Sequence, residues 1–119
     1  MAAHHTDPTE PIIPRPERTP AALRVALAQV APHRLADMGR QEDEAIALAA
    51  QSRSLGPVLQ FLESWVVAVE IARLPGAAAR LRAAEYTAQN TDRDDPAWRA
   101  AMDEIRALHT AARESLTHE

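Results

Sequence analysis

Apolar side chains recur at intervals of three and four residues along five stretches, and each stretch opens at or next to a proline. This spacing places the apolar residues on one face of a helix. Proline suits the first helical turn, where its missing N–H has no helical partner and its fixed φ is favourable. The predicted helices begin at Pro20, run from Pro32 to near Arg53, from Pro57 to about Arg73, from Pro75 to about Ala88, and from Pro96 to about Ser115. The pattern predicts an all-α fold, a compact bundle of about five helices.

The third predicted helix differs from the others because apolar residues cover most of its circumference. A helix of this kind is surrounded by neighbours, so we expect it at the centre of the bundle. Its expected core residues are Phe61, Leu62, Trp65 and Val69. The expected solvent-facing strip on this helix is narrow and consists of Gln60, Glu63, Ser64, Val67 and Glu70.

The N-terminal segment has a different composition. Four of the nine prolines fall within residues 1–18, where Ile12 and Ile13 are the only large apolar residues after Met1. Such a segment buries too little apolar surface to fold alone. We therefore expect a disordered Pro-rich arm over residues 1–18 and a single helical domain over residues 19–118.

Composition narrows the classes of function. The chain has 119 residues and a net charge of −4, and residues 91–119 hold seven acidic but only four basic side chains. Nucleic-acid binding draws its affinity from a basic face, so binding by this chain alone is disfavoured. The apolar run Val58 to Leu74 is interrupted by charged and polar residues, which argues against a membrane span. With no cysteine and no charged signal-peptide start, we expect a cytoplasmic protein.

Residues that commonly carry chemistry are present but not assembled. None of the five histidines forms an HxxxH or HExxH pattern for a metal. The carboxylates have no spacing that implies a catalytic pair, and three glycines cannot build a phosphate-binding loop. We therefore expect no enzymatic activity and no cofactor or metal.

Five residues are candidates for binding a partner protein. Trp98 stands in the first turn of the last helix beside Asp94 and Asp95, which is a composition typical of a binding edge. The alternatives are core packing for Trp98 and favourable charge at a helix N-terminus for the two aspartates. Glu42 interrupts the apolar stripe of the second helix, either as a contact residue or as a local weak point. His109 borders the stripe of the last helix and could lie in an interface.

Two motifs resemble a known family. The run from Thr19 to Leu27 (TPAALRVAL), followed by Ala31-Pro32-His33-Arg34-Leu35, and the run from Gly56 to Trp65 (GPVLQFLESW) resemble small, uncharacterised helical proteins of high-GC actinomycetes. The similarity spans roughly residues 19–85. Members are sometimes encoded beside RelE/ParE-type toxins, so the resemblance implies an antitoxin or partner-binding role.

The leading hypothesis is a helical protein–protein interaction module, in its narrower form an antitoxin-like partner of a small basic toxin. A self-associating homodimer is the alternative, and a helix-turn-helix DNA-binding regulator is disfavoured by charge. A small-molecule pocket near Trp65 is also considered, although no convergent polar group points to one in the sequence.

Overall fold

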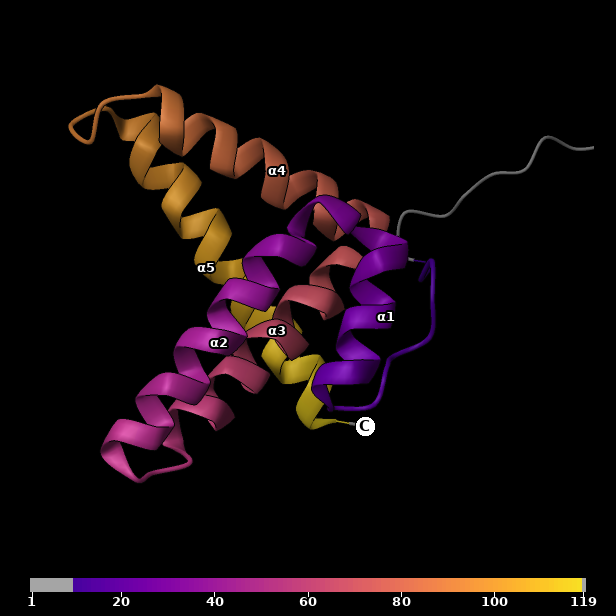
Figure 1. The fold of residues 1–119 in the computed structure, drawn as a ribbon. Coiled ribbons are helices and arrows are strands. Elements are labelled where there is room, and N and C mark those ends of the chain that lie inside the picture. Colours follow the sequence, from indigo (N-terminus) through magenta and orange to yellow (C-terminus); the bar gives the residue numbers. More distant parts are fainter. Residues whose placement is uncertain (1–9, 119) are drawn as a thin grey trace, which may run out of the picture.

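Five α-helices form close to the predicted boundaries, and the expected all-α class is confirmed (Figure 1). The structure is a computed structural model, and it describes residues 10–118. Within that range no strand forms. The elements are α1 (Pro20–Val30), a 3₁₀ turn η1 (Pro32–Arg34), α2 (Leu35–Ser52), α3 (Gly56–Ala72), α4 (Pro75–Asn90) and α5 (Pro96–Thr117).

Helix starts follow the local chemistry of the sequence. Thr19 caps α1 by accepting a 3.2 Å hydrogen bond from the backbone N–H of Ala22, and Asp95 caps α5 by accepting one of 2.9 Å from Ala97. Each cap satisfies a first-turn N–H group that has no partner inside its helix. Pro32 opens the 3₁₀ turn rather than α2 itself, so the predicted second helix begins three residues later than expected.

Helix α3 lies at the centre, as predicted, and contacts α1, α2, α4 and α5. The two sides of α3 pack against different helices. One side packs with α1 and α2 around the core residues Leu23, Leu27 and Met38. The other side packs Val67 and Ile71 against Leu108 and Ala112 of α5. The molecule therefore has two apolar clusters that share one helix.

The residues expected in the core lie mostly in the first cluster. Phe61, Trp65 and Val69 are buried, and Leu62 is partly buried at the edge of the cluster. The prediction that Val67 faces solvent is wrong, because α5 covers it and leaves only 2% of it exposed. Sequence periodicity cannot reveal this burial, since the covering helix lies far along the chain.

Residues 10–18 form an extended strap that crosses the C-terminal end of α3. The backbone N–H of Ile12 donates to the carbonyl oxygen of Arg73 at 2.8 Å, and Arg73 Nη1 donates back to the carbonyl of Ile13 at 3.2 Å. The expected disorder therefore does not extend to residues 10–18. The remaining part of the predicted arm, residues 1–9, lies outside the described residues.

Glu70 anchors the strap through two arginines. Arg15 donates from Nε and Nη2 to the two carboxylate oxygens at 2.9 and 3.0 Å. Arg73 donates from Nε and Nη2 to the same two oxygens at 2.8 and 3.3 Å. The predicted solvent exposure of Glu70 is wrong, because only 2% of the residue is exposed. Its burial is tolerated because both oxygens receive charged donors.

The pKa of Glu70 reflects this environment. Burial alone would raise it, but the hydrogen bonds from Arg15 and Arg73, together with their positive charges, lower it below the ordinary value. Glu70 is therefore ionised in the folded chain at neutral pH.

Helices α4 and α5 form a hairpin whose turn projects away from α1 and α2 (Figure 1). Small side chains mediate the helix contact, with Ala84 and Ala101 both buried. Close approach through alanine explains how a chain with 26 alanines packs a hairpin that offers few large apolar groups.

Candidate functional site

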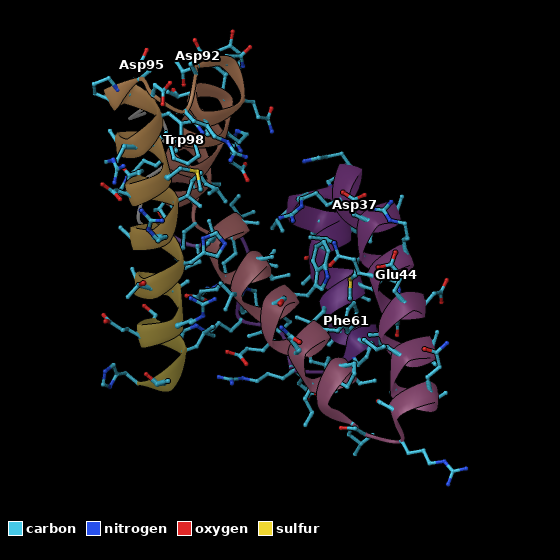
Figure 2. The ribbon with its side chains drawn as sticks, turned by 90° about the vertical axis from the view of Figure 1, so that its left-hand side faces the viewer. Asp37, Glu44, Phe61, Asp92, Asp95 and Trp98 are labelled. Carbon is cyan, nitrogen blue, oxygen red and sulfur yellow. The ribbon has the colours of Figure 1, made fainter. Side chains whose placement is uncertain are left out.

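The sequence-predicted partner residues fall into three separate places. Trp98, Asp94 and Asp95 lie at the turn between α4 and α5, at the far end of the hairpin (Figure 2). Trp98 is partly buried, and the guanidinium carbon of Arg93 lies 5.8 Å from the centroid of its ring. Asp95 serves as the N-cap of α5, which gives it the structural role considered in the sequence analysis.

Glu42 lies on α2, away from that turn, and forms an ion pair with Arg24 of α1. This contact links α1 and α2. It explains why a charged residue interrupts the apolar stripe of α2. Gly39, one turn earlier, leaves open space around the position that a Cβ would occupy. The structure therefore does not bring Glu42 together with the other candidates.

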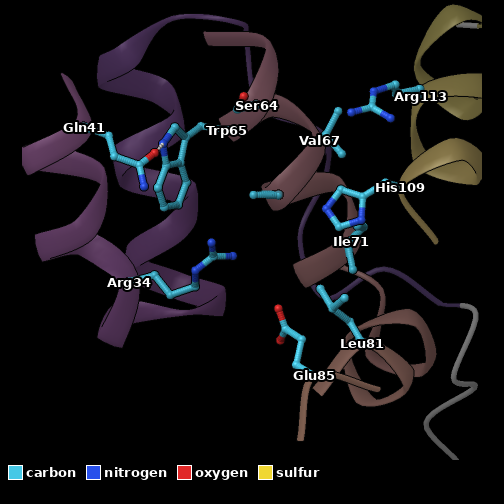
Figure 3. A pocket seen from close by; sticks show the side chains of 11 residues that line it. Arg34, Gln41, Ser64, Trp65, Val67, Ile71, Leu81, Glu85, His109 and Arg113 are labelled. Carbon is cyan, nitrogen blue, oxygen red and sulfur yellow. Dashed lines mark hydrogen bonds between the residues drawn. The ribbon is translucent and has the colours of Figure 1, made fainter. Parts of the chain in front are cut away.

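His109 points into a cleft that residues of five elements line. The cleft has a volume of about 210 Å³ and lies beside α3, between η1 and α2 on one side and the α4–α5 hairpin on the other (Figure 3). We call it the central cleft. Val67, Ala68 and Ile71 of α3 and Leu81 of α4 form its apolar lining.

One wall of the central cleft is built around Trp65. Its indole N–H donates to Oε1 of Gln41 at 3.0 Å, which fixes the ring against α2. The guanidinium carbon of Arg34 lies 4.8 Å from the ring centroid, in cation–π geometry. Arg34 is thus held over an aromatic face, while its donors remain without an ion-pair partner among the described residues.

The opposite walls carry further ionisable groups. Glu85 comes from α4, whereas His109 and Arg113 come from α5 (Figure 3). His109 Nδ1 lies 2.8 Å from the carbonyl oxygen of Ile105, and since a carbonyl only accepts, Nδ1 carries the hydrogen. Nε2 is then the acceptor in the neutral ring. Neither Glu85 nor Arg113 forms an ion pair with a described residue.

A second hollow lies between α3 and the C-terminal end of α5. We call it the α3–α5 groove, and its volume is about 510 Å³. Leu59, Leu62 and Val66 line one side and Leu116 lines the other, with Arg18, Glu63 and Arg113 among the polar residues of the lining. The groove is mainly apolar, whereas the lining of the central cleft mixes apolar residues with charged and polar ones.

Sequence reasoning found His109 and Trp65 but missed Arg34 and Glu85 as site residues. Arg34 lies outside the apolar stripe predicted for its helix, and Glu85 lies inside or borders the stripe predicted for its own, so neither stands out as a site residue. They share a cleft only because α3 brings α2 and α4 to its two sides. No local pattern in the sequence carries that information.

Within residues 10–118, no group of three or more histidine, aspartate or glutamate side chains is placed to hold a metal ion. None of the described helices combines the length and the apolar character needed to cross a membrane. No protein-family model, curated protein or solved structure matches the chain. The function must therefore be argued from the geometry of the cleft and the groove.

Proposed function

We propose that this chain is a helical protein–protein interaction module and that the α3–α5 groove receives an amphipathic helix of its partner. The observation that carries the proposal is an apolar stripe along α3. Leu55, Leu59, Leu62 and Val66 follow one another at intervals of four, three and four residues, which places them along one side of the helix axis.

The residues of the stripe become more exposed toward the N-terminal end of α3. Val66 is 9% exposed and belongs to the first core cluster, whereas Leu59 is 60% exposed and Leu55, just before α3, is 72% exposed. Leu116 provides a facing apolar wall, so a groove rather than a flat patch results. Apolar anchors at such spacing are the usual receptor for the apolar face of another helix.

Charge at the groove indicates the chemistry of the partner helix. Arg18 and Arg113 contribute two positive charges, against one negative charge from Glu63. A helix with acidic residues beside its apolar stripe would complement this arrangement. The acidic turn at Asp94 and Asp95 lies about 30 Å away, near the other end of α5, at a rise of about 1.5 Å per residue. It offers a separate contact for a basic surface of the same partner.

The narrower form of the proposal is an antitoxin-like role, which the resemblance of residues 19–85 favours. A second copy of this chain is the alternative occupant of the groove. The experiment described next separates these possibilities, since each predicts a different species in complex with the chain.

The test compares Leu59→Asp with Val25→Asp as a matched control. The two side chains are exposed to nearly the same extent, 60% and 63%, but Val25 lies on α1 outside the groove. Each variant is co-expressed with the product of the adjacent gene, and the wild type alone is examined by analytical ultracentrifugation for self-association. We expect Leu59→Asp to weaken partner binding at least about tenfold, because a buried, unpaired carboxylate is costly.

Val25→Asp should bind as the wild type does, and amide exchange should show protection of α3 and α5 in the complex. Equal binding by wild type and Leu59→Asp would overturn the groove assignment. Rescue of toxicity by Val25→Asp but not by Leu59→Asp would support the antitoxin form. A stable dimer of the wild type that Leu59→Asp dissociates would assign the groove to a second copy instead.

A further inference from the structure

The central cleft presents charges of opposite sign that do not pair with each other. Arg34 and Glu85 project into it from different walls, and Arg113 adds a second positive charge at its α5 side (Figure 3). None of the three forms an ion pair with a described residue. The acidic and basic side chains of the central cleft therefore do not pair with one another.

The position of Arg34 favours a carboxylate. A guanidinium group offers donors in a planar fork that matches two carboxylate oxygens. Trp65 holds Arg34 from one face, so that its donor edge is left to meet a ligand.

Glu85 and the apolar lining indicate which other groups a ligand would carry. Glu85 is an acceptor that suits an ammonium group. Ile71 and Leu81 provide apolar surface between the charged groups. The volume of about 210 Å³ falls below the 300–1,000 Å³ typical for drug-sized ligands. A molecule of a few heavy atoms is therefore the appropriate size.

From this arrangement we propose that the central cleft binds a small zwitterion of the α-amino-acid type. Its carboxylate lies toward Arg34, its ammonium group toward Glu85, and its apolar side chain on Ile71 and Leu81. An anion without an amine would leave Glu85 unpaired beside it. A cation without a carboxylate would leave Arg34 without a counter-charge. Only a ligand with both charges satisfies both sides.

The inference is independent of the proposed groove function. The central cleft and the α3–α5 groove share only Val67 and Arg113 in their linings. Loss of partner binding in Leu59→Asp would therefore leave this proposal standing, and failure of ligand binding would leave the groove assignment untouched.

Three probes of matched shape test the charge requirement: L-leucine, 4-methylpentanoate, which lacks the amine, and isopentylamine, which lacks the carboxylate. Each is titrated into the ¹⁵N-labelled full chain while the indole N–H resonance of Trp65 is followed by NMR. Trp98→Phe identifies which of the two indole signals belongs to Trp65. We expect leucine to shift the Trp65 signal with a dissociation constant on the order of 1 mM, and both analogues to bind at least about tenfold more weakly.

Two variants assign the preference to residues. Glu85→Gln should keep its affinity for 4-methylpentanoate and lose the advantage of leucine over that analogue. Glu114→Gln is the matched control, since Glu114 is also an exposed glutamate without an ion pair among the described residues but does not line the cleft. It should behave as the wild type. Glu85 is exposed, so unchanged thermal unfolding is expected and checks that the variant folds.

Three results would overturn the proposal. The first is no shift of the Trp65 signal with leucine up to about 10 mM. The second is equal binding of leucine and 4-methylpentanoate, which would leave an anion site at most. The third is an unchanged preference for leucine in Glu85→Gln, which would remove Glu85 from recognition of the ammonium group.

Discussion

Arg73 donates to the carboxylate of Glu70 from one turn further along the chain, at 2.8 Å, and both residues are buried. An ion pair on a helix surface contributes only tenths of a kcal/mol. This one differs because Glu70 is nearly inaccessible and because Arg73 also binds the strap through its own backbone carbonyl. The pair therefore connects the end of α3 to residues 10–18.

Replacement of Glu70 by Gln should lower the free energy of unfolding by about 2–4 kcal/mol, because two arginines lose their charged partner in a buried site. Urea denaturation measures the change. Amide exchange should also accelerate at Ile12, whose N–H donates to Arg73. Glu44→Gln is the control, since Glu44 is exposed and its contact with Arg40 is long at 3.9 Å. Equal stability of the two variants would show that the strap does not depend on Glu70.

Low pH should weaken the ion pairs between Glu70 and its two arginines. The pKa of Glu70 is lowered from its ordinary 4.5, so folding favours the ionised form. The resulting stabilisation is complete above pH 4.5 and is lost as pH falls through the lower pKa of the folded state. The difference in unfolding free energy between wild type and Glu70→Gln should therefore shrink in acid. Urea denaturation of both proteins from pH 7 to about pH 3 measures it, and other carboxylates cancel in the difference. A constant difference would contradict a lowered pKa.

Arg53 ends α2 in the left-handed region, at φ 55° and ψ 38°, where glycine is favoured. Arg53→Gly should raise the free energy of unfolding by roughly 0.5–1 kcal/mol, after allowing for the greater freedom of glycine in the unfolded chain. Arg99→Gly makes the same chemical change in the first turns of α5 and should instead destabilise by about 1 kcal/mol. Chemical denaturation of both variants gives the comparison. A loss of stability in Arg53→Gly would indicate a contact of the arginine side chain that outweighs the backbone preference.

Features determined by neighbouring residues could be predicted from the sequence. Helix starts at prolines and the caps at Thr19 and Asp95 depend on a few adjacent positions, and so does the apolar character of α3. The burial of Glu70 could not be predicted, because its partner Arg15 is 55 residues away in the chain. Arg34 and Glu85 were missed for the same reason. Their relationship depends on how α2 and the α4–α5 hairpin are placed around α3, and helical periodicity does not describe that placement.

The two apolar clusters predict different responses to cavity-forming substitutions. Leu108 is 5% exposed and joins α5 to Val67 and Ile71, whereas Met38 is fully buried between α2 and the rest of the first cluster. Each change to alanine should cost about 2–5 kcal/mol of unfolding free energy.

The two changes should loosen different parts of the chain, however, because α3 is the main connection between the clusters and the α4–α5 hairpin has its own alanine-mediated contact. Leu108→Ala should accelerate amide exchange in α5 while α1 and α2 remain protected, and Met38→Ala should do the reverse. Exchange measured by mass spectrometry under native conditions distinguishes these patterns. Uniform acceleration along the whole chain in both variants would show instead that the bundle opens as one cooperative unit, with α3 transmitting the loss of packing from either side to the other.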